Sequence, residues 1–352
     1  RERFTGIAQD LACGIDIGSL LDEVEDTLAK GGSRDYAGSR GEYLSARIIT
    51  DYLGAAFVEA GDGILFTEDG GVDPETYHRF HALLLGEGLF VIPGFYGTGA
   101  DGKVKIFSRG GSDITGALVA RASGSHVYEN WTDVSGLLMA DPRIIDHPAP
   151  VPEVTYREIR ELAAMGANVF HEEAMIPVRD AGIPINIKNT NDPDHPGTRI
   201  VNEHTVPVSI AGVSGIRGVS LVRVGKTLMN REPTFVGSVK KALDKSGISV
   251  LRTFTGVDTA TLLCAGGNPT VEDLNRTTDA DTVSVHLRIA LVTLVGEGLN
   301  LSGVCALLKG LSDAAIAVEL ADYASSGISV TVAVKEEAFK KTLETVYSAS
   351  AP

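Results

Sequence analysis

The sequence predicts an α/β protein in two parts, and three observations lead to this fold class. Short apolar runs alternate with helix-like segments through residues 1–203, which is typical of a mostly parallel sheet covered by helices. The residues after 203 contain a diverged repeat of strand, helix, strand and strand. The acidic excess of the chain lies entirely in the first part, so the two parts differ in charge as well as in pattern.

The charge excludes some classes of partner and places a domain boundary. The 352 residues include 31 Lys+Arg and 46 Asp+Glu, a net charge of −15. Residues 1–203 carry 17 of the basic and 32 of the acidic side chains. An acidic chain is a poor nucleic-acid binder, and no apolar run reaches the roughly 18 residues of a transmembrane helix. We expect neither nucleic acid nor membrane as a partner, and a boundary after Glu203.

The elements of the first part follow one another as strand and helix. A capping box, Thr155-x-x-Glu158, begins a helix that runs through Ala164. Gly182 ends a further helix after Arg179. The other expected segments are strands within residues 88–93, 126–131 and 183–188, and helices over residues 43–52 and 113–122.

The second part repeats itself. Leu221-Val-Arg-Val matches Leu291-Val-Thr-Leu, and each copy predicts a βαββ unit. In the first copy a helix after Pro233 places Val236, Val239 and Leu243 on one face, and residues 335–348 form a last amphipathic helix. Such units are compact modules without obvious catalytic residues. Cys13, Cys264 and Cys305 are too scattered for a disulfide framework or a zinc cluster, which fits a reducing cytoplasm.

Two loops carry candidate site residues. In Arg109-Gly110-Gly111-Ser112-Asp113, paired glycines before a helix expose N–H groups that suit an anion. Arg109 can grip a carboxylate or phosphate, and Asp113 an ammonium group. The alternative is a tight turn with Ser112 or Asp113 as the N-cap.

The second loop runs from Trp131 to Arg143. It follows an expected strand, and ligands of open α/β sheets lie at the carboxyl ends of strands. Asp133 could bind a ribose hydroxyl and Arg143 a phosphate, whereas a turn-rich connection is the alternative.

Other motifs are weak. Gly225-Lys226-Thr227 lacks the glycine spacing of a P-loop, and His171-Glu-Glu lacks the zinc spacing HExxH, so no metal-ligating residues are expected. Asp192-x-Asp194-His195 is typical of a solvated turn. Glu42 precedes the helix expected over residues 43–52, where a first-turn acid favoured by the helix dipole is the plain interpretation.

These motifs in their order resemble the aspartate kinases. The order is Ser39-Arg-Gly-Glu42, residues 108–113, residues 131–136 with Asp141-Pro-Arg143, residues 165–171, and then paired βαββ units. The family joins an amino-acid-kinase (carbamate-kinase-like) domain to two ferredoxin-like ACT domains. The resemblance therefore implies a kinase domain over 1–203, a first ACT domain over 204–282 (with 335–352 as its possible completion) and a second over 283–334.

The resemblance also implies a reaction and its residues. ATP, with Mg²⁺, would phosphorylate the side-chain carboxylate of L-aspartate to 4-phospho-L-aspartate. Arg109 would bind the α-carboxylate and Glu42 the ammonium group, and Asp113 would order the substrate with a catalytic lysine. The turn of Gly110, Gly111 and Ser112 would complete the substrate site. The residues implied at the nucleotide are Thr132, Asp133, Gly136, Asp141 and Arg143.

The ACT domains imply regulation. Lysine, threonine or both would act as effector, and the chain would dimerise through its ACT domains. The effector-lining residues implied by position are Met229, Phe235, Ser249, Val250 and Thr255; for Phe235 and Val250 the alternative is plain ACT core.

The sequence departs from the family pattern at two places. The Lys-Phe-Gly-Gly segment that supplies the catalytic lysine is absent, and we expect it upstream of Arg1 in the natural protein. Where many relatives have Gly-Ala-Lys this chain has Gly166-Ala-Asn168, for which Lys188 is a possible substitute. Two other functions stay open: an amino-acid sensor with a decayed kinase domain, and another amino-acid kinase with an acidic substrate.

Overall fold

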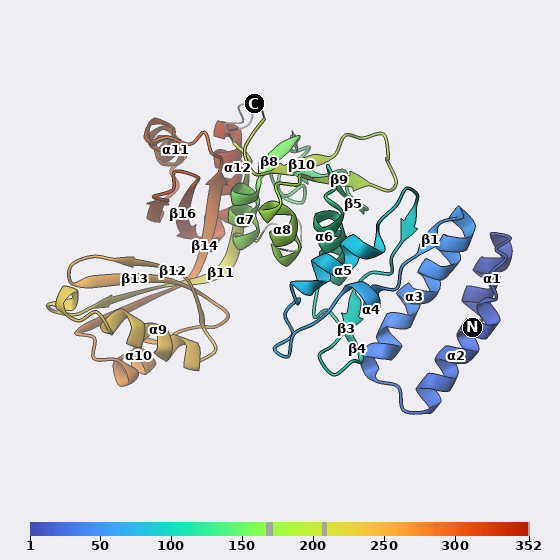
Figure 1. Cartoon of the computed structure of the whole chain (residues 1–352). Coiled ribbons are helices and arrows are strands. Elements are labelled where there is room, and N and C mark those ends of the chain that lie inside the picture. The colour runs from blue at the N-terminus through green and yellow to red at the C-terminus, as the bar shows by residue number, and fades with distance from the viewer. Residues whose placement is uncertain (167–171, 206–209, 351–352) are drawn as a thin grey trace. The chain divides into compact units, whose positions relative to one another are not determined.

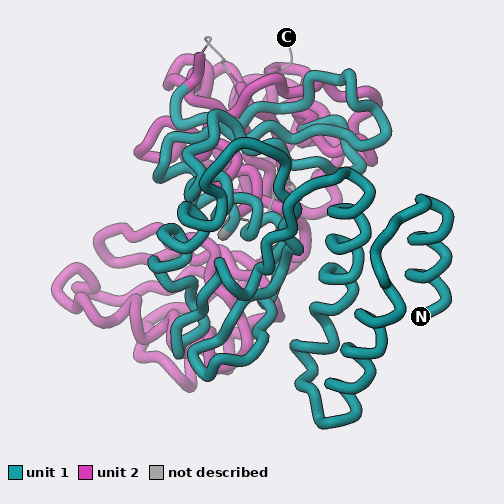
Figure 2. The backbone as a smooth tube through the Cα atoms, turned by 45° about the vertical axis from the view of Figure 1, so that its right-hand side comes forward, with its two compact units in different colours: residues 1–136, 170–203 teal, residues 137–169, 204–352 magenta. Residues whose placement is uncertain are grey.

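The structure is a computed structural model that describes residues 1–166, 172–205 and 210–350. The chain forms two compact units (Figures 1 and 2). Unit 1 comprises Arg1–Gly136 and Phe170–Glu203, and unit 2 comprises Leu137–Val169 and His204–Pro352. The chain therefore enters unit 2 twice, and residues 137–169, which we expected in the kinase domain, group with the second unit. The predictions for Asn168 and His171 lie outside the described residues.

Unit 1 is a mixed α/β unit. Its helices are α1 (Glu2–Asp10), α2 (Ile17–Ala29), α3 (Arg34–Leu53), α4 (Ala60–Gly63), α5 (Glu75–Leu83), α6 (Gly111–Ser123) and α8 (Glu172–Asp180). Its strands are β1 (Ala56–Phe57), β2 (Phe90–Val91), β3 (Tyr96–Thr98), β4 (Val104–Ile106), β5 (Tyr128–Thr132), β9 (Ile185–Asn189) and β10 (Thr198–Val201). The predicted strands and helices after residue 88 are all present.

The pairing of these strands is only partly parallel. β1 pairs with β2 and β5 with β9 in parallel, whereas β10 runs antiparallel to β9 and β3 with β4 forms a hairpin. One apolar cluster, centred on the fully buried Phe80, packs Ile114 and Leu118 of α6 against Ile64 and Phe66. This cluster anchors α6, whose first turn carries the candidate site.

Helix α3 begins earlier than the sequence predicts. The Ser33 side chain accepts a hydrogen bond from the Tyr36 N–H at 3.0 Å and caps the helix nine residues before Glu42. Glu42 is thus an exposed residue in the middle of a 20-residue helix. The interpretation of Glu42 as a first-turn acid is wrong, because the serine cap lies upstream of the apolar run we used to place the helix.

Unit 2 holds the repeat. Its elements are β6 (Leu137–Leu138), β7 (Pro150–Val151), β8 (Glu153–Thr155), α7 (Tyr156–Ala164), β11 (Gly212–Gly225), a 3-10 turn η1 (Met229–Arg231), α9 (Phe235–Lys245), β12 (Ser249–Thr255), β13 (Thr259–Ala265), α10 (Val271–Thr277), β14 (Thr282–Val295), α11 (Leu301–Asp313), β15 (Val318–Tyr323), β16 (Ser329–Lys335), η2 (Glu336–Ala338) and α12 (Phe339–Ser350). The capping box at the start of α7 is formed as predicted.

One six-stranded antiparallel sheet, in the order β12-β13-β11-β14-β16-β15, serves both modules. β11 and β14 pair along their length, with register shifts near Gly218 and Arg288, both of which have positive φ. The first module consists of the second half of β11, α9, β12, β13, α10 and the first half of β14. The second module consists of the second half of β14, α11, β15, β16, α12 and the first half of β11. Each module is therefore a complete βαββαβ unit.

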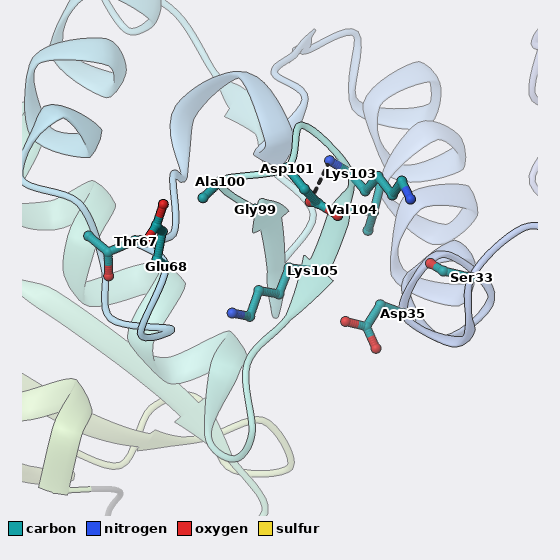
Figure 3. Close-up of a pocket in the computed structure, with 10 residues that line it drawn as sticks. All are labelled: Ser33, Asp35, Thr67, Glu68, Gly99, Ala100, Asp101, Lys103, Val104 and Lys105. Carbon is teal, nitrogen blue, oxygen red and sulfur yellow. Dashed lines mark hydrogen bonds between the residues drawn. The ribbon is translucent and has the colours of Figure 1, made fainter.

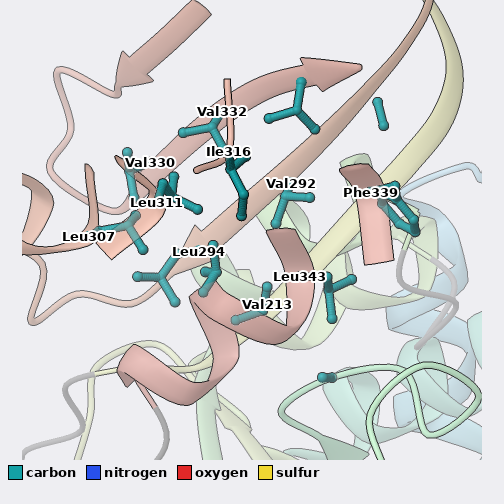
Figure 4. Packing of buried hydrophobic residues seen from close by; sticks show 14 of the residues in the cluster. Val213, Val292, Leu294, Leu307, Leu311, Ile316, Val330, Val332, Phe339 and Leu343 are labelled. Atoms are coloured by element: carbon teal, nitrogen blue, oxygen red, sulfur yellow. The ribbon is translucent and has the colours of Figure 1, made fainter. Parts of the chain in front are cut away.

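The last helix belongs to the second module, not to the first as we expected. Phe339 and Leu343 of α12 pack with Leu307 of α11 and Val330 of β16 in one buried cluster (Figure 4). Val346 of α12 belongs to the same cluster. The strand that completes this module is the first half of β11, which contributes Val213 to the same cluster. The module therefore takes its fourth strand from a segment that precedes the first module in the chain.

A buried charged cluster joins three segments of unit 2. The side chains of Glu153 and Glu158 are 5% and 0% exposed. His204 lies between them, with Nε2 2.8 Å from Glu158 Oε2 and Nδ1 3.5 Å from Glu153 Oε1. Glu158 also accepts hydrogen bonds from the N–H groups of Thr155 at 2.8 Å and Glu297 at 2.9 Å. The cluster ties the start of α7 to residue 204 and to the turn after β14.

No helix among the described residues is long and apolar enough to cross a membrane.

Candidate functional site

The first turn of α6 begins at a glycine pair and has no side-chain cap. Gly110 is the N-cap, in the left-handed region at φ 57°, and no side chain caps the helix. A Cβ on Gly111 would lie 2.8 Å from Phe107 Cβ and 2.9 Å from Phe95 Cα, so only glycine fits there. The alternative that Ser112 or Asp113 is the N-cap is wrong. The first N–H groups of α6 are left without a side-chain cap beside Arg109, which is exposed.

Asp113 is held by the neighbouring strand rather than by its own helix. Asn130 Nδ2 on β5 donates to Asp113 Oδ1 at 2.9 Å and to Tyr128 Oη at 3.1 Å. Tyr128 Oη donates to the Asp113 carbonyl oxygen at 3.2 Å. Burial raises the pKa of Tyr128 to about 12, so its hydroxyl stays a donor. Neither Asn130 nor Tyr128 could be selected from the sequence, because a pair of residues on different elements leaves no local pattern.

The loop before β3 closes over the same turn. Phe95 has a φ of 78°, and its N–H donates to Thr115 Oγ1 at 3.0 Å, while Thr115 Oγ1 donates to the Gly111 carbonyl at 2.7 Å. A Cβ on Gly94 would lie 3.2 Å from Ser112. The Pro93-Gly94 dipeptide was the available signal for this tight loop.

Glu42 lies on helix α3. This helix contacts β2 and β4, the strands that lead into Gly94 and Arg109, and a Cβ on Gly38 would lie 3.9 Å from Ile106 Cδ1. Glu42, one helical turn after Gly38, lies on the same face. Its neighbour Arg40 has a different role, since its guanidinium lies over the rings of Tyr36, Tyr43 and Tyr96 at 4.5, 4.6 and 5.2 Å.

The carboxyl ends of β5 and β9 meet at one edge of unit 1. The Thr132 carbonyl accepts the Thr190 N–H at 2.8 Å, and Asn189 Nδ2 donates to Ser135 Oγ at 2.8 Å. Gly136 has a φ of 90°, and a Cβ there would lie 2.4 Å from Thr198 Oγ1. Thr132, Asp133 and Gly136 thus share this edge, as predicted for a ligand loop. Lys188 does too, with its Nζ 5.0 Å from the centre of the Trp131 ring.

Asp141 and Arg143 lie in unit 2 and bind each other. Arg143 Nη2 donates to Asp141 Oδ2 at 2.7 Å and Nε to Oδ1 at 2.9 Å. The Arg143 guanidinium holds the pKa of Asp141 below its usual value. The Arg143 side chain is 87% exposed, so a phosphate could take its free donors without burying charge.

A hollow of about 650 Å³ lies beside the β3–β4 hairpin of unit 1. Lys105 lies in it between Glu68 and Asp35 (Figure 3). None of the residues predicted for the substrate or nucleotide lines this hollow. It is a mixed-charge, open surface feature.

The predicted effector residues divide into core and surface. Met229 and Phe235 are 5% and 3% exposed and pack in the core beneath α9, and Val250 is half-buried against them. Ser249 and Thr255 are exposed at the two ends of β12, an edge strand. The Lys226 ammonium is paired with carboxylates, with Glu232 at 3.0 Å and with Asp279.

We expect Gly111→Ala to damage the turn directly. The added Cβ would overlap the backbone of Phe95, so the loop must shift, at a cost of about 1–3 kcal/mol in unfolding free energy. Aspartate binding by the natural protein should weaken at least tenfold in calorimetry. Gly6→Ala in α1 is the control, because nothing lies within 4 Å of its Cβ. Unchanged binding in Gly111→Ala would remove this turn from the site.

The chain matches known proteins over most of its length. Residues 7–189 match the model of the amino acid kinase family. Aspartokinase 3 of Bacillus subtilis is 33% identical over 374 residues, covering 98% of this chain and 82% of the relative. The crystal structure of aspartate kinase from Clostridium acetobutylicum has a TM-score of 0.91 at 37% identity, covering 99% of this chain and 82% of that one.

More distant structures share the fold. Aspartokinase III of Escherichia coli, in complex with lysine and aspartate, has a TM-score of 0.76 at 23% identity, with 95% of this chain and 82% of that chain covered. The same enzyme with aspartate and ADP has a TM-score of 0.70 at 22% identity, with 99% and 86% covered. Both structures therefore share the fold of this chain.

Proposed function

This chain belongs to the amino acid kinase family and, within it, to the aspartokinases, and from that premise we infer which of its residues carry the reaction. The resemblance seen in the sequence is confirmed. The chain is an aspartate kinase, an enzyme that uses a nucleotide to phosphorylate the side-chain carboxylate of aspartate. Phosphoryl transfer to a carboxylate requires alignment of the two anions and neutralisation of their charge.

We propose that the first turn of α6 binds aspartate. Arg109 and the free N–H groups after Gly110 would together bind the α-carboxylate. Glu42 would bind the ammonium group. Asp113 would order the same end of the substrate. The observation that carries this proposal is the glycine turn: it leaves N–H donors without a side-chain cap beside an exposed guanidinium.

We propose that the nucleoside lies at the carboxyl edge of β5 and β9. Thr132, Asp133 and Gly136 would contact it, with Lys188 as a further cation. The described residues contain no group of three His, Cys, Asp or Glu side chains that could hold a metal. We propose that Mg²⁺ arrives as part of the Mg–ATP substrate, coordinated mainly by phosphate oxygens.

We propose that unit 2 carries the regulation. The exposed edge of β12, with Ser249 and Thr255, offers unpaired backbone groups to a second copy of the chain, and an effector amino acid would bind beside it. The Escherichia coli relative was crystallised with lysine, so lysine or threonine is the proposed effector. Because Met229 and Phe235 are core residues, they would shape this pocket from beneath. The free cysteines fit a cytoplasmic enzyme.

One assay tests the reaction and its rivals. The natural protein is given ATP and, in turn, aspartate, glutamate or acetylglutamate, and ADP release is measured with and without lysine and threonine. We expect release with aspartate alone and inhibition by at least one effector. Release with another substrate would support another amino-acid kinase. Effector binding without any release would support the decayed sensor.

A further inference from the structure

Asn130 stands out as a polar residue in the middle of β5 that the reaction has not yet used. Residues 128 and 130 lie on one face of the strand, because successive side chains alternate. This face packs on α6, where a Cβ on Gly116 would lie 2.6 Å from Tyr128 Oη. A half-buried amide here is costly unless it is bonded, and Asn130 Nδ2 bonds both Asp113 and Tyr128.

The direction of the Asp113 carboxylate is the second observation. A carboxylate at the third position of a helix often turns back to its own N-cap. Asp113 does not, since the helix has no side-chain cap and Oδ1 accepts the Asn130 amide at 2.9 Å. Among the described residues no hydrogen bond is formed to Oδ2. One oxygen is therefore held by the strand, and the other is left for a ligand.

We propose that Asn130 is the positioning residue of Asp113: its amide holds Oδ1 and so turns the carboxylate with Oδ2 free to order the aspartate substrate. This inference rests on the proposed role of Asp113. An amide suits the task because it donates a hydrogen bond at any pH and cannot take the proton of the carboxylate. Tyr128 has a separate part, since its hydroxyl ties the same strand to the backbone of Asp113.

The first test is Asn130→Leu in the natural protein. Without the donor the carboxylate can rotate, so KM for aspartate should rise about tenfold, as expected for the loss of a charge-assisted hydrogen bond. KM for ATP should stay within twofold. Asn186→Leu is the matched control, a half-buried asparagine on β9 beside Glu129 with no bond to Asp113. It should leave both KM values within twofold.

Asn130→Asp separates positioning from mere packing. This variant keeps the shape but places a second carboxylate against Asp113. At pH 8 it should lose more activity than Asn130→Leu, and its activity relative to the wild type should recover as the pH falls to 6, because two close carboxylates share a proton. A purely structural role of Asn130 would not produce this recovery.

Comparison of Asn130→Leu with Arg109→Ala distinguishes a failure of this inference from a failure of the proposed aspartate site. If Arg109→Ala weakens aspartate use and Asn130→Leu does not, the proposed site holds and the role of Asn130 is wrong. If neither variant changes KM for aspartate, the proposed site itself fails and this inference fails with it. A lower melting temperature in Asn130→Leu with an unchanged KM also overturns the inference.

Discussion

Arg109→Ala should lower kcat/KM for aspartate by a factor of about 100 to 1000. The guanidinium would make two charge-assisted hydrogen bonds to the α-carboxylate, which together contribute about 3–4 kcal/mol. KM for ATP should stay within twofold, because the nucleotide is proposed to bind at the edge of β5 and β9. Steady-state kinetics of the natural protein with each substrate varied in turn measures both values.

Two further variants sharpen this result. Arg109→Lys keeps the charge but loses the planar fork, so about a tenth of the wild-type kcat/KM should remain. Arg199→Ala removes an exposed arginine on β10 and should change nothing. A normal KM for aspartate in Arg109→Ala would place the substrate elsewhere in unit 1. An equal loss for Arg199→Ala would point to the overall charge of this acidic protein rather than to a specific contact.

Local patterns predicted much of the fold, and long-range pairing accounts for the errors. The capping box at Thr155, the strand before Thr132 and the repeat at Leu221 and Leu291 are all present, because each depends on neighbours in the sequence. The place of α12 was wrong, because it is decided by the first half of β11, more than 100 residues earlier. No periodicity reports which strand completes which module.

In the candidate site, too, residues with a local sequence pattern could be predicted, and residues that depend on contacts between elements could not. Arg109, Gly110 and Gly111 could be selected from the sequence, since paired glycines before a helix have a local physical meaning. Asn130 could not, because its partner is on another element. Phe95 was also missed: a positive φ at a bulky residue is rare and is stabilised here by Thr115, which the sequence does not reveal.

The buried cluster of His204 should control the stability of unit 2. Both ring nitrogens face carboxylate oxygens, Nε2 at 2.8 Å from Glu158 and Nδ1 at 3.5 Å from Glu153. His204→Asn removes the ring that lies between these two buried side chains. Removing one partner of a buried polar contact costs about 1–3 kcal/mol. Hydrogen exchange of α7 should therefore report a lower opening free energy by about this amount.

Two controls test whether the loss of stability in His204→Asn is confined to the surroundings of α7. His147→Asn, in the same unit but with a side chain that is 95% exposed, should leave the exchange of α7 unchanged. The fluorescence of Trp131, the one tryptophan of the sequence, reports on unit 1 and should be unaffected by either change. Equal exchange of α7 in wild type and His204→Asn would show that the two carboxylates are accommodated without the histidine.

The pH dependence follows from Glu153. Burial raises the pKa of this carboxyl, but hydrogen bonds from the Thr205 hydroxyl and N–H and the contact with His204 outweigh it, so the pKa lies below its ordinary value of 4.5. A lowered folded pKa stabilises the protein above pH 4.5 and loses that stabilisation as the pH falls through the folded value. The contact with His204 is one cause of this lowered pKa, so the stability gap between wild type and His204→Asn should be present above pH 4.5 and shrink as the pH falls below it. A gap that persists in acid would mean that His204 acts by packing rather than through Glu153.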